Sequence, residues 1–194
     1  MSARPLLAIF VGGKSRRMGR PKGILEAPGT GASILESLVS CGRASDFAVA
    51  LVGDAEPYTE LAVDVPRIAD DPPGAGPLAG LHAALRVAVQ QRTKHVVAVA
   101  CDMPFVSPEA LAELTSHPSG AVIVAPRRAP EDPWEPMLAR YDAQALVDVL
   151  DAALADGCRS FQKLFALVEV EALPLTATVA RALEDWDAPQ DIGA

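Results

Sequence analysis

Short apolar runs recur along the chain and are separated by stretches with helical signals. The runs are rich in β-branched residues and occupy residues 6–11, 47–52, 96–101 and 121–125. Runs that are apolar at successive positions are typical of strands buried on both faces of a parallel sheet. Because strand and helix alternate, the pattern predicts an α/β domain with a mostly parallel central sheet, whose ligands bind beyond the carboxyl ends of the strands.

Capping residues predict where several helices begin. Ser33, with Glu36 three residues later, predicts a capping box for a helix that runs to residue 43. Ser107 followed by a proline is a typical start for another helix. The remaining elements expected from the pattern are helices over residues 78–90 and 143–155 and short strands near residues 66–69 and 136–141.

The composition supports one domain over residues 1–194. Hydrophobic residues make up 50% of the chain, which is ample for a continuous core. Cys41, Cys101 and Cys158 are widely spaced, so we expect reduced thiols, no zinc site and a cytoplasmic protein. No apolar span has the length of a transmembrane helix and no signal-peptide pattern opens the chain, so we expect no membrane partner.

Charge is distributed unevenly along the chain. The formal net charge is -8 and the pI is about 4.8, which argues against nucleic acid as a partner. Residues 14–22 nevertheless contain no acid and hold a cluster of basic side chains, Lys14, Arg16, Arg17, Arg20 and Lys22. A basic island in an acidic protein predicts a small anionic ligand.

The basic island overlaps the segment FVGGKSRRMGRPK, residues 10–22, which contains paired glycines. Paired glycines bring bare backbone N–H groups close to an anion, and the basic side chains neutralise its charge, so the segment predicts a phosphate-binding loop. It is not a Walker A loop, because the first required glycine would fall on Ala8. It does not fit a G-x-G-x-x-G fingerprint either. An ordinary strand-to-helix turn remains the alternative.

Asp102 follows the strongly apolar strand at residues 96–101. A carboxylate there is costly unless it faces a cleft or binds a cation, and Mg²⁺ favours one or two carboxylates together with substrate phosphates. The alternative role, a helix N-cap, suits Ser107 better. Asp187, near the C-terminus, is a candidate second metal ligand, although it could equally cap a helix that starts near Pro189.

Six motifs together carry a family resemblance. They are FVGGKSRRMGRPK, DPPGAGPLAGL, CDMPF, EPMLARY, GCRSF and DWDAPQDI. In this order and spacing the chain resembles the molybdenum cofactor guanylyltransferases over essentially its whole length. The resemblance implies a three-layer, Rossmann-like nucleotidyltransferase fold, with a nucleotide-binding half at about residues 1–105 and an acceptor-binding half at about residues 106–194.

The resemblance also implies roles for individual residues. Lys22 matches the phosphate-binding lysine, Asp102 the magnesium aspartate and Asp70 a nucleotide-contacting aspartate. The GPLAG segment resembles the part of the family that reads guanine, whose N1–H and N2–H₂ donors a glycine-flanked turn can meet with backbone carbonyls. The implied nucleotide-binding residues are Phe10, Val11, Gly12, Gly13, Lys22, Asp70, Gly76, Pro77, Leu78, Ala79, Gly80 and Asp102.

The chain departs from the usual family pattern in three places. Phe10 and Val11 stand where leucine and alanine are usual, which would put a bulkier edge by the nucleotide. Gly53 stands where some relatives have an asparagine that touches the nucleotide, so that contact would be missing. Two acids of the DWDAPQDI motif, Asp185 and Asp187, stand where many guanylyltransferases have asparagines.

By resemblance, the expected reaction transfers GMP from GTP to the phosphate of a molybdopterin-type acceptor and releases pyrophosphate. The acceptor phosphate is itself the nucleophile, so catalysis depends on positioning and charge neutralisation. The expected catalytic residues are Lys22, Arg17 and Asp102, with Mg²⁺ on Asp102 and Asp187. The expected partners are GTP and the acceptor, and further candidates are other proteins of molybdenum cofactor biosynthesis or apo-molybdoenzymes.

Recognition of the acceptor is less well defined by the motifs. The candidate residues are Arg127, Arg128, Trp134, Glu135, Pro136, Arg159 and Ser160. An exposed loop in which Trp134 covers a small hydrophobic patch is an equal alternative. Three other functions also stay open at this point: transfer with CTP or to another phosphorylated acceptor, sugar-phosphate nucleotidyl transfer, and a non-catalytic GTP-binding adaptor.

Overall fold

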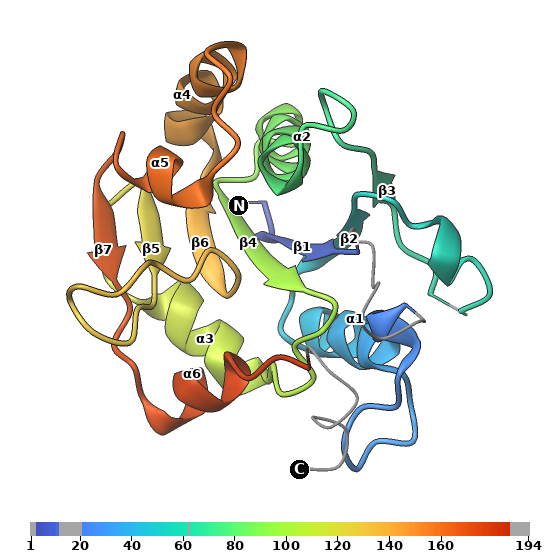
Figure 1. The fold of residues 1–194 in the computed structure, drawn as a ribbon. Helices are drawn as coiled ribbons and strands as arrows, with labels where there is room; N and C mark the ends of the chain where they lie inside the picture. The colour runs from blue at the N-terminus through green and yellow to red at the C-terminus, as the bar shows by residue number, and fades with distance from the viewer. Residues whose placement is uncertain (1–2, 12–20, 62, 187–194) are drawn as a thin grey trace.

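The computed structural model describes residues 3–11, 21–61 and 63–186, and these build one seven-stranded sheet with helices on both faces (Figure 1). The strand order across the sheet is β3-β2-β1-β4-β6-β5-β7. The strands are β1 (Leu6–Phe10), β2 (Ala48–Val52), β3 (Arg67–Ile68), β4 (His95–Ala100), β5 (Ile123–Ala125), β6 (Ala139–Asp142) and β7 (Val170–Ala172).

One strand runs against the others. β6 is antiparallel to both β4 and β5, whereas the remaining pairs, β1 with β2, β1 with β4, β2 with β3 and β5 with β7, are parallel. The mostly parallel sheet predicted from the apolar runs is therefore confirmed. The short strand β7 was not predicted, because its sequence is half-exposed and too short to form an apolar run.

Helices cover the sheet in two layers (Figure 1). One face carries α1 (Ile34–Ala44), α3 (Pro108–Ser116) and α6 (Ala177–Ala182), and the other carries α2 (Pro77–Gln90), α4 (Ala143–Ala155) and α5 (Phe161–Phe165). Along β1 the side chains alternate between the faces: Leu7 and Ile9 join the first core, while Leu6, Ala8 and Phe10 join the second. This double burial explains why β1 is apolar at every position.

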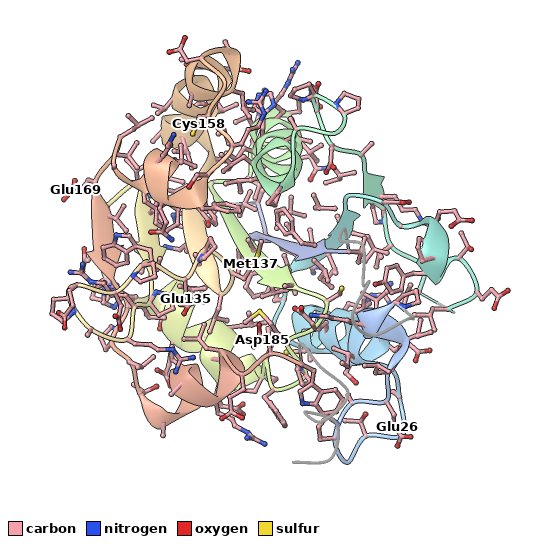
Figure 2. All side chains as sticks on the ribbon, viewed as in Figure 1. Glu26, Glu135, Met137, Cys158, Glu169 and Asp185 are labelled. Atoms are coloured by element: carbon pink, nitrogen blue, oxygen red, sulfur yellow. The ribbon has the colours of Figure 1, made fainter. Side chains whose placement is uncertain are left out.

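Side chains fill the space between the sheet and both helical layers, while charged residues such as Glu26 and Glu169 lie at the periphery (Figure 2). The three-layer arrangement is the fold class expected from the sequence. Within the described ranges, no helix combines the length and the apolar character needed to traverse a lipid bilayer.

The helix starts agree with the capping residues. Ser33 and Glu36 make both bonds of the capping box at α1, and Ser107 accepts a hydrogen bond from the Ala110 N–H at α3. α4 spans the predicted residues 143–155 and is capped by Asp142. The short helices α5 and α6, and the 3-10 turns η1 (Lys22–Ile24) and η2 (Glu56–Tyr58), were not predicted, since each is too short for a periodic pattern.

The strand predicted at residues 136–141 begins three residues later than expected. Leu138 adopts a left-handed backbone conformation with φ 61°, which breaks the extended path before β6 starts at Ala139. The Leu138 N–H still bonds to the Ala98 carbonyl of β4 at 2.6 Å, so the bend stays attached to the sheet.

The sheet order places a crevice at the ends of β1 and β4. β1 lies between β2 and β4, and the chain extends the sheet in opposite directions from these neighbours. In open α/β sheets the point where the strand order reverses opens a crevice at the carboxyl ends of the strands, and ligands bind there. The segment that follows Phe10 and the segment that follows Ala100 therefore start side by side, because these two residues are register partners.

Replacement of the α1 cap, Ser33→Ala, is predicted to lower the free energy of unfolding by about 1 kcal/mol, the usual value of a lost N-cap. The exposed Ser40→Ala on the same helix is the control and should change it by less than about 0.5 kcal/mol. Urea unfolding at neutral pH measures both. Equal effects of the two variants would contradict the assigned cap.

The Ser33 effect is also predicted to depend on pH. Hydrogen bonds from the Ser33 side chain and backbone lower the pKa of Glu36. A carboxyl group with a lowered folded-state pKa contributes stability above its unfolded pKa and loses it as the pH falls through the folded value. The difference between wild type and Ser33→Ala should therefore shrink when urea unfolding is repeated in the acid range, below the ordinary glutamate pKa.

Candidate functional site

Asp102 stands at the crevice, where the chain leaves β4 in a tight turn. The Cys101 N–H bonds to the Phe10 carbonyl at 3.0 Å, and the Met103 N–H bonds back to Ala100 at 3.2 Å. The Asp102 carbonyl accepts a hydrogen bond of 2.9 Å from the Trp186 N–H. The backbone around Asp102 is thus fixed by strand β1, by its own turn and by the C-terminal segment.

The Asp102 carboxylate forms an ion pair with Lys22. The Lys22 Nζ lies 2.9 Å from Oδ2 of Asp102, and the side chains are only 16% and 20% exposed. The two residues are 80 positions apart in the sequence. The structure therefore brings together the lysine of the glycine-basic segment and the strand-terminal aspartate, which had been predicted to share one site.

A glycine and a tyrosine hold Lys22 in place. Gly23, in η1, packs so closely on Tyr58 that a Cβ at this position would lie 2.8 Å from the ring. The Tyr58 hydroxyl in turn lies 3.5 Å from the Cys101 sulfur, directly before Asp102. A larger residue at position 23 would push η1, and with it Lys22, away from Asp102. Sequence analysis did not find this cluster, because Tyr58 is distant in the chain and carries no motif.

The thiols near and far from this site are packing groups. Burial raises the pKa of the Cys101 thiol, and burial together with Glu109 raises that of Cys41 to about 11. Thiols that resist ionisation are poor nucleophiles. Cys41, Cys101 and Cys158 are all free, as expected from their spacing.

Asp70 follows β3 and forms the second corner of the crevice, where the Lys22–Asp102 pair is the first. It packs against Gly80 of α2: a Cβ on Gly80 would meet Asp70 Oδ1 at 3.0 Å, Val52 at 2.9 Å and Phe10 at 3.1 Å. Burial, and then the neighbouring Asp54, raise the pKa of Asp70. Gly80 therefore allows α2 to approach the sheet closely enough for Asp70 to sit beside the end of β1.

A pocket opens next to Asp70 at the carboxyl ends of β2 and β3. Its volume is about 490 Å³. Several of its polar groups are acceptors, including the carboxylates of Asp54, Glu56 and Asp70, and Arg67 supplies a cation. It is lined by Gly53, Asp54, Ala55, Glu56, Thr59, Arg67, Ala69, Asp70, Pro73 and Gly74.

The GPLAG segment forms the start of α2, with Gly76 as its N-cap at φ 79° and Pro77 in the first turn. Gly76 and Pro77 are exposed, whereas Leu78, Ala79 and Gly80 are buried in the core. Phe10 and Val11 are also buried, at 7% and 4% exposure, so their bulk packs in the cores rather than along the crevice. A ligand that binds beside the start of α2 or the end of β1 would therefore contact backbone groups rather than these buried side chains.

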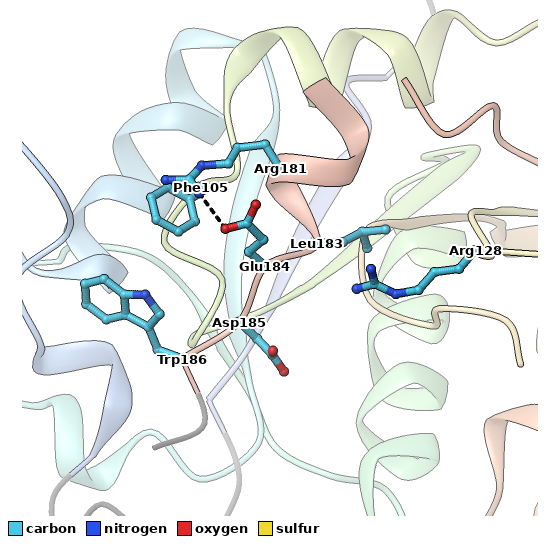
Figure 3. Close-up of a pocket in the computed structure, with 7 residues that line it drawn as sticks. All are labelled: Phe105, Arg128, Arg181, Leu183, Glu184, Asp185 and Trp186. Atoms are coloured by element: carbon cyan, nitrogen blue, oxygen red, sulfur yellow. Dashed lines mark hydrogen bonds and ion pairs between the residues drawn. The ribbon is translucent and has the colours of Figure 1, made fainter. Parts of the chain in front are cut away.

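A third corner is a pocket formed by the C-terminal segment (Figure 3). The Arg181 guanidinium stacks over the Phe105 ring at 3.4 Å from its centroid and pairs with Glu184, and Phe105 contacts Trp186 edge-on. The pocket has a volume of about 320 Å³. It is lined by Phe105, Arg128, Arg181, Leu183, Glu184, Asp185 and Trp186.

The structure separates the candidate acceptor-binding residues. Arg127 stacks on Trp134 at 4.2 Å from the ring centroid, and Trp134 packs against Phe165. Arg159 donates hydrogen bonds to the Leu154 and Cys158 carbonyls at the end of α4. Arg128 differs from these, because its side chain is 62% exposed and reaches the third corner.

Several predicted site residues lie outside the described part of the chain. These are Gly12, Gly13, Arg16, Arg17 and Asp187. Among the described residues, no group of three or more His, Cys, Asp or Glu side chains gathers as a metal site. Asp102 is nevertheless suited to Mg²⁺, since its partly exposed carboxylate follows the carboxyl end of β4 and this ion commonly takes one or two protein carboxylates plus phosphate oxygens.

Comparison with known proteins identifies relatives over most of the chain. Residues 7–172 match the family model for the MobA-like NTP transferase domain. A protein from Opitutus terrae named "Probable molybdenum cofactor guanylyltransferase" is 31% identical over 192 residues, which cover 95% of this chain and 91% of that protein. A protein of the same name from Mycobacterium avium is 29% identical over 171 residues, with coverages of 86% and 83%.

Solved structures show the same fold. The crystal structure of molybdopterin-guanine dinucleotide biosynthesis protein A from Archaeoglobus fulgidus superposes with a TM-score of 0.76 at 28% identity, covering 96% of this chain and 94% of that one. The 2-C-methyl-D-erythritol 4-phosphate cytidylyltransferase from Thermus thermophilus has a TM-score of 0.66 at 19% identity, covering 95% and 93%. The second likeness concerns the fold alone.

Breaking the ion pair is predicted to destabilise the protein. Lys22→Ala should lower the free energy of unfolding by about 1–3 kcal/mol, because it leaves the largely buried Asp102 carboxylate without this cation. The double variant Lys22→Ala/Asp102→Asn should lose less than the sum of the two single variants. Urea unfolding of all four proteins measures this coupling, and strict additivity would show that the pair contributes nothing.

Proposed function

Because the chain belongs to the MobA-like NTP transferase family, we propose that it transfers GMP from GTP to the phosphate of a molybdopterin-type acceptor. Membership of this family makes the protein a nucleotidyltransferase; GTP and the acceptor are the proposed substrates. An acceptor phosphate oxygen would form a bond to the α-phosphorus of GTP, the bond from that phosphorus to the bridging oxygen would break, and pyrophosphate would leave.

The observation that carries this proposal is the meeting of Lys22 and Asp102 at the reversal point of the sheet. A nucleoside triphosphate needs a cation against its phosphates and a carboxylate that can hold its metal ion. When the nucleotide binds, the Lys22 ammonium group would leave Asp102 and contact phosphate oxygens. The Asp102 carboxylate would then be available to bind the metal ion. The ion pair thus keeps both groups neutralised until the nucleotide replaces it.

The phosphates would be held by Lys22, by Arg17 and by the backbone N–H groups of Gly12 and Gly13. Asp102, with Asp187 as a second carboxylate, would hold Mg²⁺, which stabilises negative charge on the transferring and leaving phosphates. No side-chain nucleophile or base is needed, because the attacking phosphate is already ionised. The protein's contribution is to align two polyanions and to neutralise their charge.

The second corner would bind the nucleoside. Asp70 lines the acceptor-rich pocket together with Pro73 and Gly74, and the exposed residues Gly76 and Pro77 follow directly in the same turn. Guanine has three N–H bonds on its N1 and N2 edge, which match oxygen acceptors at such a turn better than the mixed edge of cytosine does. This favours GTP over CTP.

The third corner would bind the acceptor. It adjoins Asp102, because Trp186 in its wall donates a hydrogen bond to the Asp102 carbonyl. Arg181 is already engaged by Phe105 and Glu184, whereas Arg128 is 62% exposed and forms a longer ion pair of 3.9 Å with Glu135. Arg128 is therefore the cation in this pocket that an anionic acceptor can recruit at least cost. Other molybdenum cofactor biosynthesis proteins and apo-molybdoenzymes are the partners that such a product would require.

The direct test is pyrophosphate release from GTP in the presence of Mg²⁺ and molybdopterin. Wild type should release pyrophosphate with GTP and much less with CTP. Asp102→Asn should lower kcat by about 10²-fold or more, because the neutral amide binds the metal poorly. Asp148→Asn, an exposed aspartate on α4, is the control and should leave the rate unchanged.

The alternatives predict different results in the same assay. Higher turnover with CTP would identify a cytidylyltransferase, and turnover only with another phosphorylated acceptor would replace molybdopterin. GTP binding by calorimetry without pyrophosphate release from any acceptor would indicate an adaptor. Each of these outcomes would overturn the proposed reaction.

Removal of the acceptor-side cation should affect one substrate selectively. Arg128→Ala is predicted to raise the KM for the acceptor several-fold, as expected for one lost charge contact, while the KM for GTP stays within about two-fold. Arg92→Ala is the matched control, because Arg92 lies before the amino end of β4, at the opposite end of this strand from Asp102. Equal KM values for the acceptor in both variants would remove Arg128 from the acceptor site.

A further inference from the structure

A histidine of α2 lies at the contact between the turn before GPLAG and helix α4. His82 is only 3% exposed. Its Nδ1 lies 2.9 Å from the Asp71 carbonyl oxygen, and its Nε2 lies 2.7 Å from Oδ1 of Asp151 on α4. An oxygen atom lies against each ring nitrogen of this buried histidine. His82 therefore links the turn that contains Asp71 to helix α4, in addition to packing in the core.

The contact with Asp71 requires the ring to donate from Nδ1, because a carbonyl can only accept. At Nε2 the carboxylate lies within ion-pair distance but off the axis of a well-formed hydrogen bond, since this buried nitrogen makes none. The hydrogen bond to the Asp71 carbonyl is thus the contact that orients the ring. The Asp151 carboxylate packs against the opposite, Nε2 side of the ring.

The residue that His82 holds belongs to the turn at residues 70–76. The Asp71 N–H bonds to the Ala79 carbonyl at 3.3 Å, and its carboxylate lies 3.3 Å from Arg86 of α2. The Arg86 pair is half-exposed and therefore weak, whereas the His82 contact is shielded from water. Of the three contacts that fasten Asp71 to α2, His82 makes the one that comes from a buried side chain.

Movement of Asp71 would move its neighbour. Asp70 precedes it and lies so close to Gly80 that a Cβ on this glycine would be 3.0 Å from Asp70 Oδ1. Because Gly80 and His82 lie on the same helix, α2 holds Asp70 from one side through Gly80 and from the other through the Asp71 carbonyl. Loss of the histidine bond would free the turn to move away from α2 and carry Asp70 with it.

We propose that His82 is a positioning residue, which holds the turn at residues 70–76 in the geometry that binds the nucleoside and is braced by Asp151 on α4. The inference rests on the proposed function, in which Asp70 and the exposed start of GPLAG bind GTP. It adds a residue that touches no substrate. The turn is thereby connected to a helix of the other half of the chain.

Steady-state kinetics with GTP and calorimetric GTP binding test this proposal. His82→Leu keeps the volume but removes both polar contacts, and it should raise the KM and Kd for GTP about ten-fold while kcat stays within about three-fold. His82→Asn places an amide N–H where Nδ1 donates and should recover most of the affinity. Asp151→Asn should give an intermediate loss, and Asp148→Asn, an exposed neighbour on α4, should have no effect.

The possible failures are distinguishable. If wild type neither binds GTP nor releases pyrophosphate from it, the proposed function fails and this inference with it. If wild type binds GTP and His82→Leu binds it equally well, only the inference is wrong. A merely structural histidine would lower Tm and kcat together, without a selective rise in KM and without recovery in His82→Asn, and that pattern would also overturn the proposal.

Discussion

The ion pair between Lys22 and Asp102, beyond the carboxyl end of β4, sets the requirements for the surrounding structure. β4 is buried along most of its length and ends at Ala100, so Asp102, two residues later, carries its carboxylate at the end of a buried strand. A charge in such a position is unfavourable unless another charge compensates it. Lys22 provides that compensation at 2.9 Å. A metal-bound polyanion can replace such a pair. Its phosphate oxygens bind the lysine, and its metal ion binds the carboxylate.

The fold supports this pair from several distant segments. Gly23 lets η1 lie against Tyr58, and Tyr58 touches Cys101, the residue before Asp102. Trp186 binds the Asp102 backbone from the far end of the described chain. The site therefore depends on contacts between segments that are distant in sequence but pack in the same core, on one face of the sheet, and single changes remote from Lys22 can disturb it. Its rigidity suits a reaction in which the protein mainly aligns and neutralises phosphates.

Much of the fold could be predicted from the sequence, because long apolar runs and capping residues are local signals. The strands β1, β2 and β4 and the helices α1, α2 and α4 follow from them. β7, α5 and α6 could not, since they are short and owe their structure to tertiary contacts. For the site, Lys22 and Asp102 were recognisable from residue chemistry, and the sheet order explains why they meet. The roles of Tyr58, Trp186 and His82 depend on long-range packing that no local pattern contains. The Phe10 side chain was expected to form a bulky edge beside the nucleotide, but it is buried in the core.

The central claim is that a metal-bound nucleoside triphosphate replaces the contact between Lys22 and Asp102. A crystal structure of the protein with GTP and Mg²⁺ tests it most directly. The account predicts that the Lys22 Nζ has moved onto a phosphate oxygen, that the Asp102 carboxylate binds the metal, and that the base lies against the start of α2. A nucleotide bound elsewhere, with Lys22 and Asp102 still paired, would contradict it.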